Sequence, residues 1–322
     1  MAITVDFSSL STYTDQIQMP IIRSAVLTST LMDCGINYQE NVTNVTSLNI
    51  MSSTLTPKLG GSCAAFSATG STTLSQRSIT VKPFLVEEEM CPDKFKEYWT
   101  KEITRSGSYD EVGADQFNQV YTAYKLEQVA ASVEDNFFCG TTTGTASSGF
   151  YNSTLTITDG VLHNLLLTSA SASVIRVGTA SGITTAWTTA NALSNFDTLV
   201  ANIPTDVLNE TDLTCFMSHA TFITLLQAAR TANLYHYGAD MKNWVITNFL
   251  GTPVTIRAVR GLKYTNKVFI TNASNLYLGT DLNNDYEKFR TWYSYDNNTV
   301  RTQLKWRLGT QVAFPQNVVI WG

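Results

Sequence analysis

The stretch Asp110–Phe138, DEVGADQFNQVYTAYKLEQVAASVEDNFF, decides the fold of this chain. Its apolar residues recur at spacings of three and four, which places them on one side of a helix. Asp110 or Ser108 can cap the start of this helix, and Gly140 can end it in the left-handed conformation. At 1.5 Å per residue, a helix of about 25 residues is roughly 37 Å long. The sequence therefore predicts a long amphipathic helix over 110–138 that lies across a sheet or beside a partner.

A second stretch near the C-terminus, Val300–Leu308, has the strict alternation that is typical of a strand. In VRTQLKWRL the odd-numbered positions are polar, and they include Arg301, Lys305 and Arg307. An aromatic segment, Phe289–Tyr295, precedes it, and residues 296–299 have turn chemistry. We expect a long antiparallel hairpin with one basic face and one apolar face, the latter covered by the predicted helix.

The region between the helix and this hairpin has the character of a separate α/β domain. Leu213–Met217, LTCFM, predicts a short buried strand, and Ser218 is placed to cap a helix that begins at His219. A helix before Pro204 and short strands within 253–278 extend the alternation. Residues 191–280 are therefore predicted to be inserted between the long helix and the hairpin.

The N-terminal part of the chain is expected to depend on a neighbour for its order. Residues 1–45 are polar and irregular, which is typical of an arm. Residues 46–86 predict two strands joined by a flexible tip that contains Pro57, Lys58, Gly60 and Gly61. A hairpin with so little apolar content does not fold alone, so it must rest on this chain or on another copy.

The segment Glu87–Trp99, EEEMCPDKFKEYW, follows this hairpin. Consecutive glutamates at 87–89 point in different directions, and no histidine is near, so we interpret them as a solvated or interface charge run rather than a metal site. Pro92 suits the first turn of a short amphipathic helix that carries Phe95, Tyr98 and Trp99.

Composition and charge narrow the function classes. Charged residues make up only 15% of the 322 residues, against roughly 25% in an average soluble domain. Either the surface is rich in Ser, Thr and Asn, or other chains cover much of it. The net charge of −5 argues against a dedicated nucleic-acid binder. Five widely spaced cysteines form no disulfide framework or zinc pattern, and no secretory signal or membrane-spanning segment is found.

The order of these elements resembles that of the major capsid proteins of tailed bacteriophages, which have the Hong Kong 97-like fold. Three segments carry the local similarity: GTPVTIRAVRGL at Gly251–Leu262, the stretch Val268–Ser294 with its N-L-x-x-G-T-D-L-x-N-D turn, and RLGTQVAFPQNVV at Arg307–Val319. The segment Glu87–Trp99 is in addition similar to the crAss-like branch of gut phages.

The resemblance implies an α+β fold with four parts. They are an N-terminal arm (1–45), an extended loop (46–86), a peripheral domain with the long spine helix (87–190 and 281–322) and an axial domain (191–280). It further implies a virion coat protein, made in the host cytoplasm, that assembles into pentamers, hexamers and an icosahedral shell without cofactor or metal. The implied partners are other copies, a portal protein, a separate scaffolding protein, decoration proteins and packaged double-stranded DNA, but no membrane.

Two alternatives for the basic face stay open. Arg301, Lys305 and Arg307 either contact DNA phosphates without sequence preference or pair with acidic residues of an adjacent subunit, such as Glu87–Glu89. The crosslinking of a loop lysine to asparagine that some relatives perform is not carried over to Lys58, because no local sequence matches its catalyst or acceptor.

Three other functions compete with a virion coat. An enzyme is disfavoured because HExxH, GxSxG, GxGxxG and P-loop patterns are absent. Of the three histidines, His163, His219 and His236, we consider His219 with Cys91 or Cys215 as a nucleophile–base pair of a hydrolase, but three histidines at the ends of elements are more often structural. An encapsulin-like nanocompartment shell shares the fold. A tail-tube or adhesin subunit should lack the long helix.

Overall fold

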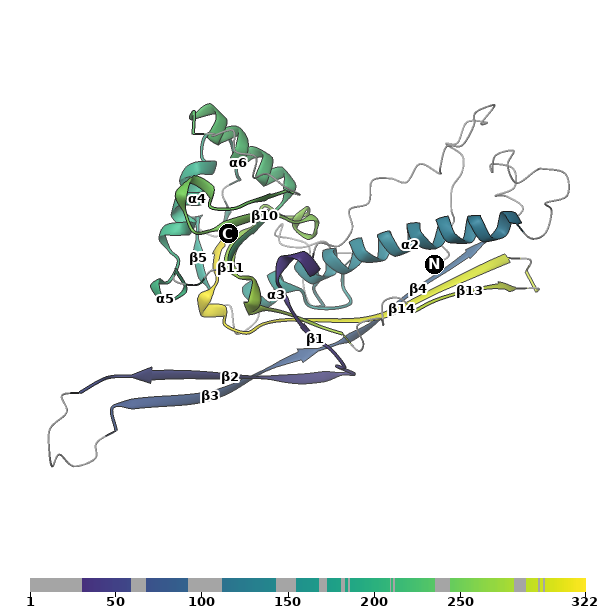
Figure 1. Cartoon of the computed structure of the whole chain (residues 1–322), viewed down its shortest axis with the longest axis horizontal. Helices are drawn as coiled ribbons and strands as arrows, with labels where there is room; N and C mark the ends of the chain where they lie inside the picture. Colours follow the sequence, from purple (N-terminus) through teal and green to yellow (C-terminus); the bar gives the residue numbers. More distant parts are fainter. Residues whose placement is uncertain are drawn as a thin grey trace.

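The computed structural model describes residues 31–58, 68–91, 112–142, 155–167, 173–180, 183–184, 186–208, 210, 212–234, 244–280, 288–294, 296–297 and 299–322. Figure 1 shows a long helix beside a sheet, an α/β unit at one end of them, and a two-stranded ribbon that projects from the body. The predicted arm residues 1–30 and the predicted helix over 92–99 lie outside the described residues.

The predicted long helix is confirmed as α2, which spans Val112–Cys139. The helix does not end in the predicted way, because Gly140 does not adopt the left-handed conformation with positive φ. The glycine is required instead for close packing: a side chain at position 140 would overlap the carbonyl oxygens of Thr158 and Asn136. The helix therefore ends where the returning chain presses against it.

Strand β14 (Thr299–Val312) organises a five-stranded sheet against α2. It pairs in antiparallel fashion with β13 (Lys288–Ser294), β4 (Lys82–Met90) and β12 (Leu276–Gly279), and β12 pairs in parallel with β1 (Asn37–Gln39). The predicted C-terminal hairpin is therefore confirmed as β13 and β14.

The alternation along β14 is also confirmed. Leu304, Trp306 and Leu308 are buried, and they share one apolar core with Val129 and Phe138 of α2. The Trp306 ring stacks on Phe84 of β4 with 5.3 Å between ring centroids. The predicted cover of the apolar face by the long helix is thus observed.

The α/β unit is built on a six-stranded sheet with the order β5-β15-β11-β8-β10-β9. Its strands are β5 (Ile175–Val177), β15 (Val319–Trp321), β11 (Val268–Asn272), β8 (Leu213–Met217), β10 (Thr255–Ala258) and β9 (Val245–Ile246). Helices α4 (Ala192–Ala201) and α6 (His219–Thr231) pack on it. The predicted cap is confirmed, since Ser218 Oγ accepts a hydrogen bond from the Thr221 N–H at 3.2 Å.

The remaining described elements are short, apart from the two strands of the ribbon. The ribbon consists of β2 (Val45–Leu55) and β3 (Gly70–Thr80). A separate small hairpin is formed by β6 (Thr179–Ala180) and β7 (Ile183–Thr184). Short helices are α3 (Val161–Leu166), α5 (Thr205–Leu208), η1 (Met32–Cys34), η4 (Phe249–Gly251), η5 (Arg260–Leu262), η6 (Ala273–Asn275) and η8 (Pro315–Asn317).

The strand pairing departs from the expected boundaries in three places. The C-terminal β15, expected in the peripheral part, joins the sheet of the α/β unit, whereas β12, expected in the axial part, pairs with β14. The returning strand of the loop ends at Thr80, and Lys82–Met90 belongs to the sheet as β4. Residues 31–36 pack on their own chain, where Leu31 and Ile36 are buried.

Residues of both sheets belong to one apolar core at the end of α2, so β12 and β15 can join different sheets without leaving this core. The Phe138 ring at the end of α2 lies 5.8 Å from the Phe216 ring of β8 and 6.3 Å from the Phe269 ring of β11. Phe216 and Phe269 in turn stack at 5.2 Å. The apolar side chains of both units therefore exclude water together at the place where the two sheets meet.

Candidate subunit-interaction surfaces

The β2–β3 ribbon is the most exposed structure in the described part of the chain. Its strands pair over eleven residues each, from Val45 opposite Thr80 to Leu55 opposite Gly70, and they belong to no larger sheet. In Figure 1 the ribbon leaves the body near β1 and extends away from it at the lower left. Pro57 and Lys58 follow β2 at exposed positions, whereas Gly60 and Gly61 lie outside the described residues.

Among the described residues, the contacts between the ribbon and the rest of its chain are made at the base. Ile79 is fully buried there with Val42 and Val81, and Leu48 and Tyr277 pack against this small cluster. Beyond the base, Leu55 and Leu74 are 82% and 80% exposed. A ribbon with such exposed side chains has the form expected of a segment that another molecule covers.

The predicted basic face lies on β14, and two of its residues have partners within their own chain. Arg301 Nε lies 3.1 Å from Glu89 Oε1 of β4, and Arg307 Nη1 donates to the Thr43 carbonyl oxygen at 2.9 Å. Lys305 is exposed. Strand β4 thus brings a carboxylate of the 87–89 run beside Arg301 of the same chain.

The three glutamates of β4 alternate between the two faces of the sheet. Glu88 faces α2, where its Oε2 lies 2.6 Å from Lys125 Nζ, and it is largely buried. Glu87 and Glu89 face the other way, and Glu87 Oε1 accepts a hydrogen bond from Gln303 Nε2 at 2.6 Å. Hydrogen bonds from Thr299 and Arg301 lower the pKa of Glu89. Of the run 87–89, interpreted as a solvated or interface charge run, Glu88 is neither solvated nor free for another subunit, because it pairs with Lys125 inside its own chain.

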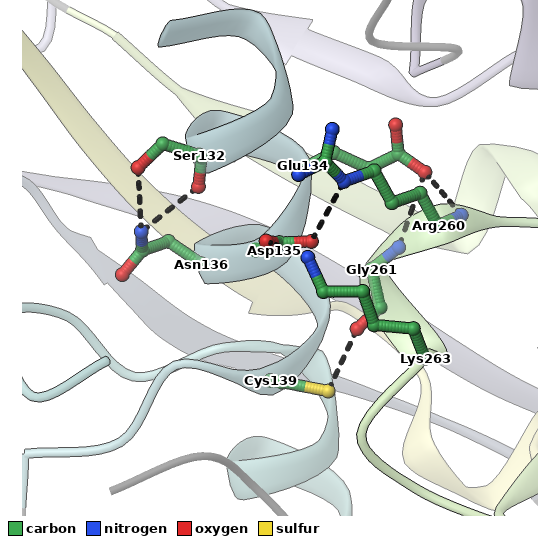
Figure 2. Close-up of polar contacts among 8 residues, drawn as sticks. All are labelled: Ser132, Glu134, Asp135, Asn136, Cys139, Arg260, Gly261 and Lys263. Atoms are coloured by element: carbon green, nitrogen blue, oxygen red, sulfur yellow. Dashed lines mark hydrogen bonds and ion pairs between the residues drawn. The ribbon is translucent and has the colours of Figure 1, made fainter. Parts of the chain in front are cut away.

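A polar joint connects the end of α2 to the turn η5 of the α/β unit (Figure 2). Glu134 is fully buried, and its Oε1 accepts hydrogen bonds from the backbone N–H groups of Arg260 at 2.7 Å and Gly261 at 3.2 Å. Beside it, Asp135 Oδ2 lies 2.6 Å from Lys263 Nζ and Asp135 Oδ1 lies 3.7 Å from Arg260 Nε. Two carboxylates at the C-terminal end of a helix oppose its dipole, so these cations and N–H donors are needed to stabilise them.

Close backbone approach completes the joint. A Cβ atom at Gly261 would lie 2.5 Å from both the Glu134 carbonyl oxygen and Phe138 Cδ2, so only glycine fits there. The Cys139 thiol donates to the Gly261 carbonyl oxygen at 2.8 Å, and burial raises the pKa of this thiol strongly. Figure 2 shows the hydrogen bond of Cys139 to Gly261 beside the contacts of Glu134 and Asp135.

The candidate catalytic residues are dispersed and mostly structural. The buried His163 lies with its Nδ1 2.8 Å from Thr141 Oγ1. His219 packs edge-on against Trp244 at 5.0 Å between ring centroids, and burial lowers its pKa. Cys215 is fully buried within β8, and His236 lies outside the described residues.

Within the described part of the chain, no group of three or more His, Cys, Asp or Glu side chains is arranged to hold a metal ion. No helix among the same residues has the length and apolar character needed to cross a membrane.

Comparison with known proteins gives a consistent result. No family model and no curated protein matches the sequence. A chain from Gordonia phage Cozz superimposes with a TM-score of 0.56 at 10% identity, covering 96% of this chain and 90% of that chain. A chain from the capsid of the native GTA particle gives 0.54 at 12% identity, covering 99% and 98%. A chain from the satellite phage P4 procapsid gives 0.54 at 11% identity, covering 90% and 95%.

These similarities extend over nearly the whole of each chain. The identity is too low to carry residue roles from one protein to another, but the architecture is shared. The chain therefore has the α+β, Hong Kong 97-like fold of capsid proteins.

Proposed function

We propose that this chain is the major capsid protein of a tailed-phage-like particle, a structural protein that assembles into an icosahedral shell. The observation that carries the proposal is the match, over at least 90% of each chain, to chains from a phage, a GTA capsid and a phage procapsid. The projecting ribbon supports it, because a subunit with an uncovered ribbon is suited to completion by neighbours.

The finer parts of this proposal concern stoichiometry and partners. The subunit forms pentamers and hexamers, in which the α/β unit lies near the symmetry axes and the ribbon overlaps a neighbour. Portal, scaffolding and decoration proteins are its other partners, and the virion is its location. Its place in the crAss-like branch stays a prediction from Glu87–Trp99.

The basic face of β14 is proposed to contact packaged DNA through its backbone phosphates. Lys305 is the residue on which this rests, because it is exposed and has no acidic neighbour opposite it: its register partners are Leu85 and Lys288. Arg301 contributes less, since Glu89 offsets its charge. A contact of this kind is independent of sequence and weakens as salt rises.

The test is assembly of the purified protein alone, followed by sedimentation velocity and negative-stain electron microscopy. A concentration series with a crowding polymer raises the effective concentration in place of a scaffold. Closed shells, or rings of five and six subunits, are the expected result. A monomer of 35.5 kDa that persists through the whole series would contradict the proposal.

A further inference from the structure

The outer half of the β2–β3 ribbon has two chemically different faces. Residues directly opposite one another in an antiparallel pair lie on the same face, so the paired Met51 and Leu74 share one face. Leu55 follows on that face at an alternating position of β2. These three side chains are between 66% and 82% exposed. We call this surface the apolar face of the ribbon.

The opposite face carries only hydroxyl side chains in the outer half. They are Ser52, Thr54, Ser71 and Thr73, and all are exposed. Nearer the base the same face carries the buried Ile50, opposite Ser75, and the buried Ile79, which packs with Val42 and Val81 of its own chain. The ribbon is therefore attached through its hydroxyl face, and its apolar face is turned away from that attachment.

The apolar face has no charge among its described positions. Its other pairs are uncharged: Ser47 lies opposite Ser78, Asn49 Oδ1 accepts from Gln76 Nε2 at 2.9 Å, and Ser53 Oγ lies 3.1 Å from Thr72 Oγ1. A surface of this composition offers nothing to a phosphate group, because phosphate recognition relies on Arg, Lys and clustered N–H donors. Its chemistry fits an apolar protein surface.

The size of the face indicates which protein. Eleven residues at about 3.4 Å, across two strands about 4.8 Å apart, cover roughly 350–400 Å². A stable pairwise complex buries about 800 Å² on each partner. One ribbon is therefore too small to hold an isolated dimer, but it suffices where each subunit makes several contacts at once in a closed assembly of identical copies.

We propose that the apolar face of the ribbon, centred on Met51 and Leu74, docks on a second copy of this chain, while the hydroxyl face of its outer half stays toward solvent. This inference rests on the proposed shell function and specifies which side of the ribbon makes the contact. The contact forms in the assembly and not between two free subunits.

Two pairs of neighbouring substitutions test it. Met51→Lys and Leu74→Lys place a charge on the apolar face, and Ser52→Lys and Thr73→Lys place the same charge one residue away on the hydroxyl face. All four positions are exposed, so the fold of the free subunit should not change, which circular dichroism checks. Met51→Ser and Leu74→Ser give a milder pair without added charge.

The measurement is the concentration at which half of the subunits enter shells, by sedimentation velocity. Each apolar-face lysine should raise this concentration roughly tenfold or more, and the serine variants should raise it in the same direction. The hydroxyl-face variants should stay within about twofold of the parent. Equal effects on both faces, or none, with a parent that assembles, would overturn the inference and leave the shell function intact. A parent that never assembles would overturn the shell function itself.

Discussion

Lys263 Nζ lies 2.6 Å from Asp135 Oδ2, although 128 positions separate the two residues in the chain. This ion pair, with the two hydrogen bonds that Glu134 accepts, fixes the last turns of α2 to the turn that follows β10. Together with the packing of Phe138 on Phe216 and Phe269, these polar contacts join the long helix to the α/β unit.

The first prediction concerns Glu134. Glu134→Ala leaves the N–H groups of Arg260 and Gly261 buried without an acceptor, which costs about 1–3 kcal/mol for a buried polar group. Glu134→Gln keeps an acceptor oxygen and should lose less. Urea denaturation of the free subunit measures both. Equal losses for the two variants would contradict the role given to the acceptor.

The second prediction concerns Gly261. Gly261→Ala forces a methyl group against the Glu134 carbonyl oxygen and the Phe138 ring, so α2 and η5 must separate. Overpacking of this kind costs about 1–3 kcal/mol or more. Gly251→Ala is the control: its Cβ meets no atom within 4 Å, but its φ of 79° strains any other residue. The loss at 251 measures backbone strain without overlap, and the absence of a measurable loss at 261 would show that packing does not limit the joint.

Local patterns predicted the elements well, because each depends on a few adjacent residues. The alternation of 300–308, the buried run 213–217 and the Ser218 cap are of this kind. The resemblance of element order, rather than any one motif, predicted the fold.

The sequence did not predict strand β4, the joint or the two faces of the ribbon. Glu88 is compatible with a covered strand only because Lys125, on a different element, is there to pair with it. Glu134 and Gly261 are 127 positions apart, and nothing near either residue indicates the other. The apolar face of the ribbon became recognisable only when the register placed Met51 opposite Leu74.

The third prediction is a pH dependence of stability that arises from Lys267. This side chain is buried, and burial together with the charge of Arg176 lowers its pKa to about 8. The unfolded chain, with a pKa near 10.5, then holds the proton more tightly than the folded chain between pH 8 and 10.5. Stability should therefore rise with pH across that window, by about 2 kcal/mol from pH 7 to pH 10 for this residue.

Lys267→Met separates this contribution from other titrating groups. The variant keeps a long apolar side chain but has no proton to lose, so its free energy of unfolding should lack the rise that the parent has between pH 7 and pH 10. Urea unfolding at the two pH values gives the comparison. A rise of the same size in both proteins would assign the effect to other residues.

The last prediction separates the basic face from the sheet that bears it. Lys305→Glu should weaken binding of the subunit to a random DNA duplex at low salt several-fold, and it should lower the salt dependence by about one phosphate contact. Lys82→Glu is the matched control, because Lys82 is an exposed lysine of the same sheet, paired with Leu308, whose side chain faces the core. Fluorescence anisotropy over a salt series measures both. If Lys82→Glu weakens binding as much as Lys305→Glu, the attraction reflects overall charge, and the basic face of β14 is not a DNA-contacting surface. If only Lys305→Glu weakens it, the same variant should still form shells, because Lys305 is outside the apolar core and outside the ribbon.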